Sequence, residues 1–272
     1  MPFNSAPLSR TGIDKVRRVL VTGSRGKSSI VRLLHTALQN AGLQSYGRIT
    51  GVEPREIGPD GTRVISRSSG AHVEEMRWWL KNLPDSAQAI IMENSAITPD
   101  LQGLAGFWLR PEITVLSNVL PDHQEVWGPS STCAAEVLIA GIPRENLVLL
   151  PASLKSDHYL LELLEHRACK THFAEPVSGA VADFRADNLG LALATIERLG
   201  FSKAPALQTM LDLQPDKFDF CVISKGGAEL AMAFSANDIS STRTLFRSLS
   251  WSEEETRLIY NHRADRPARF KS

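Results

Sequence analysis

The chain has 272 residues, of which 43% are hydrophobic and 22% charged, and its 30 basic and 30 acidic side chains cancel. This composition is typical of a globular protein with one large domain or two smaller ones, and the balanced charge gives no general attraction to nucleic acid or anionic membrane. No apolar run approaches the roughly 20 residues that a membrane-spanning helix needs. The three cysteines are far apart in the sequence, so we expect reduced thiols in a cytoplasmic protein.

A glycine-rich turn follows the N-terminal segment. Residues 1–16 read as a loose leader without the apolar core of a signal peptide. The stretch V-L-V-T-G-S-R-G-K-S-S-I-V, residues 19–31, then predicts a buried strand, a tight turn and a helix from Ser28. The turn is a shortened form of the Walker A pattern, G-x-x-G-K-S, because position 21 is valine where the strict pattern has glycine.

The residue types of this turn suit a phosphate site. Two glycines let the backbone turn tightly and approach an oxyanion, and we expect the amides of the turn and of the helix start to point at it. Lys27 can reach the outer phosphates, and the Ser28 hydroxyl can bind a magnesium ion. The alternative is a structural turn with a solvated lysine. The predicted nucleotide-binding residues of the turn are Gly23, Ser24, Arg25, Gly26, Lys27, Ser28 and Ser29.

Strand and helix patterns alternate along the chain up to about residue 215. The predicted strands are 44–52, 62–67, 87–92, 113–117, 147–150 and 170–174, and the predicted helices are 30–41, 72–83, 101–109, 132–140, 154–165 and 187–199, the last strongly amphipathic. Residues 53–61 are rich in proline, glycine and charge and predict a loop or a hairpin tip, and residues 121–129 predict a loop. The alternation favours an α/β fold with a mainly parallel sheet and helices on both faces.

The composition shifts near residues 214–220. Beyond that point the sequence predicts paired strands at 220–224 and 229–234, a helix at 240–249, a strand at 257–261 and a basic tail. We therefore expect a first domain over 17–215, and over 216–272 the beginning of an α/β, Rossmann-like domain. A segment of about 50 residues buries too small a core to be a complete domain.

Polar side chains follow two of the predicted strands, at the edge where parallel α/β sheets bind ligands. Glu93 can hold magnesium against the phosphates, or be a surface glutamate at a strand end. His123, next to Asp122, can bind a second magnesium, position a carboxylate, or be a solvated loop histidine. Asp187 or Asn188 can be the N-cap of the helix that follows. His35 and the remaining histidines have no partner pattern and are expected at the surface.

Seven stretches occur in the order found in one enzyme family. They are T-G-S-R-G-K-S-S (22–29), S-G-A-H-V-E-E-M (69–76), M-E-N-S-A-I-T-P-D (92–100), S-N-V-L-P-D-H-Q-E-V-W-G-P-S (117–130), D-N-L-G-L-A-L-A (187–194), A-F-S-A-N-D-I-S-S-T (233–242) and N-H-R-A-D-R (261–266). Together they resemble the Mur ligase superfamily, which forms amide bonds with ATP, and within it the ATP-dependent ligase subunits of poly-γ-glutamate (capsule) synthases.

The resemblance implies roles for individual residues. Lys27, Glu93 and His123 would be catalytic, with Ser28 and Glu93 sharing one Mg²⁺ and His123 serving a second metal near the acyl group. The nucleotide would also contact Asn188 and, from the second domain, Asp238. The loop at Thr50 and Gly51 would lie near the acyl substrate. Many Mur ligases carry a carbamylated lysine after the D-H histidine, but the corresponding residues, 136–138, are E-V-L, as expected for the capsule-type branch.

The resemblance also implies a reaction and partners. ATP would activate a carboxylate as an acyl phosphate, and the amine of an amino acid such as glutamate would attack it, extending a glutamate polymer. The resemblance is compatible with membrane subunits of a polymer synthase as partners and with an oligomer. It is also compatible with a peripheral position at the inner face of the membrane. The family's second domain continues for roughly another hundred residues, so we expect a truncated chain or a completing partner. A P-loop kinase or ATPase and a non-catalytic nucleotide-binding subunit remain as alternatives.

Overall fold

The computed structural model describes residues 16–51, 53–67, 70–177, 183–217, 219–234, 236 and 239–259. The chain forms two compact units, one ending at Leu211 and the other beginning at Asp212, slightly before the boundary expected after residue 215. Within the described ranges, no helix is long and apolar enough to cross a membrane.

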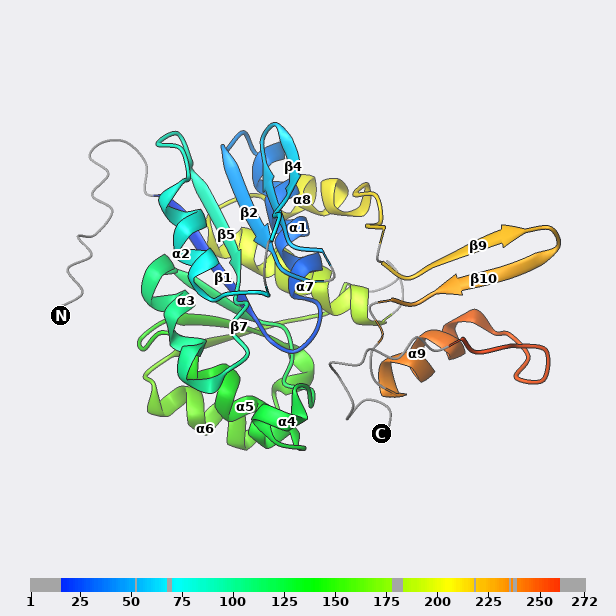
Figure 1. The fold of residues 1–272 in the computed structure, drawn as a ribbon. Coiled ribbons are helices and arrows are strands. Elements are labelled where there is room, and N and C mark those ends of the chain that lie inside the picture. Colours follow the sequence, from blue (N-terminus) through cyan, green and yellow to red (C-terminus); the bar gives the residue numbers. More distant parts are fainter. Residues whose placement is uncertain are drawn as a thin grey trace. The chain divides into compact units, whose positions relative to one another are not determined.

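The first unit is built on one eight-stranded sheet with the order β4-β3-β2-β5-β1-β6-β7-β8 (Figure 1). From β2 to β8 each strand pairs in parallel with its neighbour, whereas β3 and β4 form an antiparallel hairpin at one edge. The mainly parallel sheet is therefore confirmed. The strands are β1 (Arg17–Thr22), β2 (Ser45–Ile49), β3 (Arg55–Gly58), β4 (Gly61–Val64), β5 (Ala89–Glu93), β6 (Ile113–Leu116), β7 (Leu147–Pro151) and β8 (Lys170–Ala174).

Helices cover both faces of this sheet, as predicted (Figure 1). On one face, α1 (Lys27–Asn40), α7 (Asp183–Arg198) and α8 (Lys203–Leu211) pack against one another. On the other face lie α2 (Glu74–Lys81), α3 (Gln102–Leu109), α4 (Gln124–Trp127), α5 (Ser131–Ala140) and α6 (His158–His166), with the short 3₁₀ turns η1 (Pro99–Leu101) and η2 (Ala152–Leu154).

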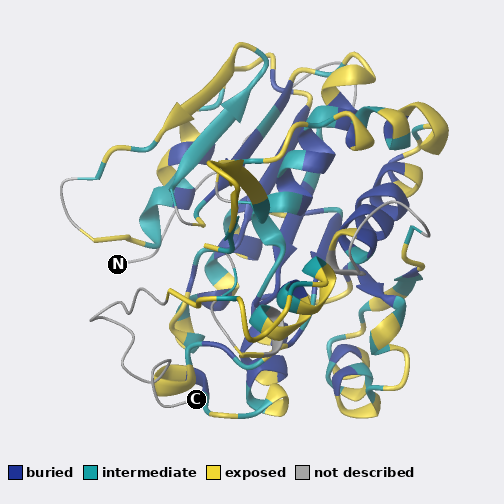
Figure 2. Ribbon diagram, turned by 90° about the vertical axis from the view of Figure 1, so that its right-hand side faces the viewer, coloured by how far each residue is buried: buried dark blue, intermediate teal, exposed yellow. Residues whose placement is uncertain are grey.

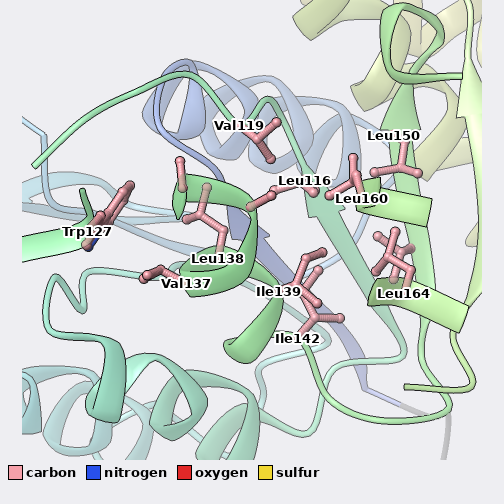
Figure 3. Close-up of a cluster of buried hydrophobic side chains, with 13 residues drawn as sticks. Leu116, Val119, Trp127, Val137, Leu138, Ile139, Ile142, Leu150, Leu160 and Leu164 are labelled. Atoms are coloured by element: carbon pink, nitrogen blue, oxygen red, sulfur yellow. The ribbon is translucent and has the colours of Figure 1, made fainter. Parts of the chain in front are cut away.

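The core lies between the sheet and its helices, where the central strands are buried on both faces (Figure 2). One apolar cluster joins β1 and β5 to α2 and α3, around Leu20, Met76 and Met92. A second joins β6 and β7 to α5 and α6, and in Figure 3 Leu116 lies beside Leu138 of α5. Burial on both faces explains why these strands read as continuous apolar runs.

Three elements of the first unit, β3, α4 and α8, lie outside the predicted strands and helices. The segment 53–61, predicted as a loop or a hairpin tip, does contain the tip of the β3–β4 hairpin. It also contains β3 itself, which has no alternation of polar and apolar residues because the hairpin lies at the edge of the sheet. The predicted loop 121–129 contains α4, which spans only four residues and is too short to show a helical period. Helix α8 was not predicted, although it packs against α1 and α7.

Helix α7 differs from its prediction in start and in burial. It begins at Asp183, so neither Asp187 nor Asn188 is its N-cap. Its residues 188–196 are buried without interruption, because α7 lies between the sheet and the other two helices of its face. The expected strongly amphipathic pattern is therefore wrong, and the helix belongs to the core. His35, expected at the surface, is also buried, in α1.

The second unit contains an antiparallel hairpin and one helix. Strands β9 (Cys221–Lys225) and β10 (Ala228–Met232) are joined by two glycines with positive φ, as a tight hairpin turn requires. Helix α9 spans Ile239–Leu249. The strand predicted at 257–261 is absent from 257–259, and residues 260 and 261 lie outside the described residues.

Candidate nucleotide and metal site

The sheet order brings the predicted site residues to one edge. β1 lies between β5 and β6, with Val21 opposite Glu93 and Thr22 opposite Leu116. The turn after β1, the end of β5 and the segment after β6 therefore meet at the carboxyl edge of the sheet. This is the position where open parallel sheets bind their ligands.

The two glycines of the turn are required by conformation and by space. Gly23 has φ 126° and Gly26 has φ 79°, a backbone region that side chains disfavour. A Cβ atom at Gly23 would lie 2.2 Å from the Ser117 hydroxyl oxygen, and one at Gly26 would lie 2.7 Å from the Asn188 amide oxygen. Asn188, buried on α7, thus lies against the start of α1.

Asn118, just after β6, braces the turn. Its amide oxygen accepts a hydrogen bond from the Arg25 backbone N–H at 3.1 Å, and its amide nitrogen donates to the Arg25 carbonyl at 3.2 Å. The Ser24 N–H points to the Asn118 carbonyl, 3.4 Å away. The amides of Ser24 and Arg25 therefore face Asn118, in contrast to the expectation that all turn amides point at a phosphate. The first turn of α1, with Lys27, Ser28 and Ser29, is the remaining part of this segment whose backbone amides suit an anion.

Lys27 lies at the start of α1 and folds back over the turn. Its Nζ donates to the Gly23 carbonyl at 2.6 Å. Burial lowers the pKa of the Lys27 ammonium, while the negative charges of Glu93 and Asp122 oppose this shift. The amine is thus held at the centre of the turn, and the two nearby carboxylates favour its charged form.

Glu93 accepts three hydrogen bonds from two other predicted site residues, Ser28 and Thr50. The Ser28 hydroxyl donates to its Oε2 at 2.9 Å. The Thr50 backbone N–H donates to Oε2 at 3.0 Å, and the Thr50 hydroxyl donates to Oε1 at 3.0 Å. Ser28 and Glu93 thus present two hard oxygen donors side by side, a donor set that suits a hard divalent cation. A Cβ at Gly51 would lie 3.0 Å from the Ser28 oxygen, so the Thr50–Gly51 loop packs on this pair.

His123 lies in a neighbouring ion-pair group. Arg25 donates to Asp122 Oδ2 at 2.7 Å, and the His123 Nε2 is 3.6 Å from the same oxygen. Burial raises the pKa of Asp122, but the charges of Arg25 and His123 lower it by more, to about 2. The imidazole also packs on Trp127, with ring centroids 5.1 Å apart. Asp122 thus links the turn to the His123 loop as a permanent anion.

Some features of the site have no signal in the linear sequence. The bracing by Asn118, the Arg25–Asp122 pair and the contact between Thr50 and Glu93 all depend on which strands are neighbours.

Within the described ranges, no three His, Cys, Asp or Glu side chains gather as a metal cluster. Asp238 lies outside the described residues. At the segment where many Mur ligases have a lysine, Val137 and Leu138 are buried in the core and Glu136 accepts a hydrogen bond from Tyr159.

Comparison with known proteins matches nearly the whole chain. The Mur ligase middle domain model matches residues 21–196, and the model of the poly-gamma-glutamate synthase CapB C-terminal domain matches residues 221–272. The chain is 31% identical over 269 residues to the capsule biosynthesis protein CapB of Bacillus anthracis, covering 92% of this chain and 58% of that protein. It is 29% identical over 269 residues to the PGA synthase CapB of Bacillus subtilis (strain 168), covering 92% and 68%.

The fold is also similar to that of solved enzymes. A structure of bifunctional folylpolyglutamate synthase/dihydrofolate synthase with Mn, AMPPNP and L-glutamate bound superposes with a TM-score of 0.63 at 14% identity, over 86% of this chain and 66% of that one. At this identity the likeness concerns the fold. Since the middle-domain model covers well over half of the 272 residues, the chain belongs to the Mur ligase family.

Proposed function

We propose that the protein is an ATP-dependent amide ligase that activates a carboxylate as an acyl phosphate and joins it to an amino acid amine. The observation that carries this proposal is the Glu93 carboxylate, held by Ser28 and Thr50 beside the glycine turn. A glycine turn, a lysine, a hydroxyl and a carboxylate at one sheet edge are the groups that phosphoryl transfer needs.

In this proposal the chain's own residues mainly bind and orient the reactants. The first turn of α1 and Lys27 bind the triphosphate, and the Lys27 charge stabilises negative charge on the transferring phosphoryl group. Ser28 and Glu93 hold a divalent cation, Mg²⁺ in our proposal, which when bound neutralises charge on the phosphate oxygens. Asn188 contacts the nucleotide beside Gly26, and His123, in the loop after Asp122, serves a second metal near the acyl group.

The reaction needs no protein nucleophile. A substrate carboxylate oxygen attacks the γ-phosphorus of ATP, the bond to ADP breaks, and an acyl phosphate results. The amine then attacks the acyl carbon and expels inorganic phosphate, leaving an amide. The main contribution of the protein is to hold the reactants together with water excluded.

We infer γ-linked glutamate as the substrate class, with Thr50 and Gly51 near the acyl group. The support is the similarity to the CapB proteins, one described as a capsule biosynthesis protein and the other as a PGA synthase. The chain spans 58% of the length of the first of these relatives. Partner subunits of a polymer synthase are part of the same proposal.

The test is product formation with Mg²⁺, ATP, glutamate and γ-linked glutamate oligomers, followed by mass spectrometry. Hydroxylamine should trap an acyl hydroxamate, which a plain ATPase or kinase would not give.

Lys27→Ala should lower ATP turnover at least about 100-fold, the size of effect expected when a charge that stabilises the transition state is removed. The matched control is Lys203→Ala, since Lys203 is half-exposed and pairs with Glu197 on the surface. ADP release without amide or hydroxamate would contradict the proposal.

A further inference from the structure

A fully buried arginine lies close to the candidate metal ligand. Arg48, in β2, has no exposed surface. Its Nη2 donates to Glu75 Oε2 at 2.8 Å, and its Nη1 is 3.4 Å from the Ser95 hydroxyl. Glu75 belongs to α2, and Ser95 follows β5 directly after Glu93 and Asn94. One guanidinium therefore ties a strand, a helix and the exit of the neighbouring strand together.

The partner carboxylate is fixed from a second side. Arg67 donates to both oxygens of Glu75, from Nε at 2.8 Å and from Nη2 at 2.6 Å. The His72 backbone N–H donates to Oε1 at 3.1 Å. Glu75 thus keeps a charged partner even without Arg48. A partly buried carboxylate that retains such a partner avoids most of the penalty of an unpaired charge.

Arg48 also lies directly before the loop that contacts the metal ligand. It pairs with Met92 across the sheet, so the next residues of both strands run side by side to the carboxyl edge. Two residues later, Thr50 donates its N–H and its hydroxyl to Glu93. The position of Thr50, and through it the direction of the Glu93 carboxylate, is therefore set by the last residues of β2.

We propose that Arg48 is a positioning residue, which fixes the exit of β2 so that Thr50 holds Glu93 ready for a divalent cation. The inference rests on the proposed metal role of Ser28 and Glu93. Groups that orient a metal ligand from behind are typically worth about 10- to 100-fold in metal affinity. Arg48 acts through Thr50, so its effect should become smaller when the Thr50 hydroxyl no longer holds the carboxylate.

The experiment is calorimetric titration of the full chain with AMPPNP, once in the presence of Mn²⁺ and once in EDTA. The dissociation constant of AMPPNP in EDTA divided by that in Mn²⁺ reports the contribution of the metal to binding. Thr50→Val should reduce this ratio about 10-fold or more, and Arg48→Met by about 5-fold, with affinity in EDTA unchanged. Arg48→Met combined with Thr50→Val should lose less than the product of the two single losses, because Thr50→Val removes the hydroxyl donor to Glu93 but keeps the backbone N–H donor. Arg48→Lys should recover part of the loss.

The control is Arg63→Met, which removes an exposed arginine that pairs with Glu56 in the β3–β4 hairpin. It should leave both affinities at the wild-type value. The inference would be overturned if wild type and Arg48→Met gave equal ratios, or if the two single losses multiplied in the double variant. It would also be overturned if Arg48→Met lost AMPPNP affinity equally with and without metal. If Mn²⁺ did not raise the AMPPNP affinity of the wild-type chain, the proposed metal site itself would be overturned. A failure of the metal site can therefore be told apart from a failure of the role of Arg48.

Discussion

The smallest features that decide the site are single atoms around the turn. Gly26 is in the left-handed backbone region with φ 79°, and the Asn188 amide occupies the space that its Cβ would fill. The sequence shows why a glycine is favoured in a turn, but the second requirement comes from a helix more than 150 residues later in the chain. Both requirements converge on the first turn of α1, where we place the phosphates.

A substitution pair tests whether binding needs glycine at the start of α1. Gly26→Ala should weaken AMPPNP binding about 10-fold or more, because the methyl group must displace Asn188 or the turn. Gly200→Ala is the control, since Gly200 also has positive φ, 89°, but no atom lies within 4 Å of its Cβ position. Both variants carry the backbone strain of about 1 kcal/mol, so equal loss of binding in calorimetry would contradict this explanation.

His35 makes stability depend on pH. Burial lowers its pKa from 6.5 to about 4, although a hydrogen bond with Gln39 opposes this shift. The unfolded chain therefore binds one more proton than the folded chain between those values, so stability falls as the pH falls below 6.5. Between pH 7 and pH 5 we expect this residue to remove about 2 kcal/mol from the free energy of unfolding.

Urea denaturation at the two pH values measures this effect. His35→Gln should reduce the loss by most of that amount, whatever its stability at pH 7. The exposed His166→Gln should keep the wild-type pH dependence. If His35→Gln and wild type lost equal stability on acidification, a pH-dependent role for His35 would be ruled out.

At the scale of elements, α7 shows how packing replaces the pattern expected from sequence. The helix is buried over residues 188–196, because both the sheet and neighbouring helices cover it. A Cβ at Gly190 would lie 2.1 Å from the Glu175 carbonyl oxygen. The backbone after β8 therefore runs directly over α7, and glycine at this position allows the close approach.

A pair of helical glycines tests this packing. Gly190→Ala should lower the free energy of unfolding by about 1–3 kcal/mol through overpacking against fixed backbone. Gly103→Ala in α3 meets its nearest atom at 3.8 Å, an ordinary contact. It should raise stability by a few tenths of a kcal/mol, since alanine favours helix. Thermal or urea denaturation should thus give opposite signs, and a neutral Gly190→Ala would show that α7 can shift.

At the scale of the whole molecule, the two units differ in how much they bury. The first has a sheet covered on both faces. In the second, Val222, Ile223 and Leu230 of the hairpin are each at least 41% exposed. A two-stranded hairpin with little burial is marginally stable. We therefore expect amide hydrogens of β9 and β10 to exchange with deuterium at least about 100-fold faster than those of β1 and β5, by mass spectrometry of peptides. Equal exchange rates in the two pairs of strands would contradict the expectation that the two units differ in stability.

Local patterns alone were enough to predict the turn, the ends of the parallel strands and the position of Lys27, Ser28 and Glu93 at one edge of the sheet. Apolar runs, glycines and helix starts are short-range signals, because they reflect backbone conformation and burial of neighbouring residues. The small exposed or four-residue elements, β3 and α4, carry too few residues for such a signal.

The tertiary structure decided which of these residues touch. Asn118 braces Arg25, Thr50 holds Glu93, and Arg48 lies buried behind them, because the chain places β1 between β5 and β6 and β2 next to β5. Strand order is set by packing of the whole sheet and its helices, and no window of sequence contains it. The sequence by itself determined the chemical groups available to the site, and the sheet order determined their arrangement.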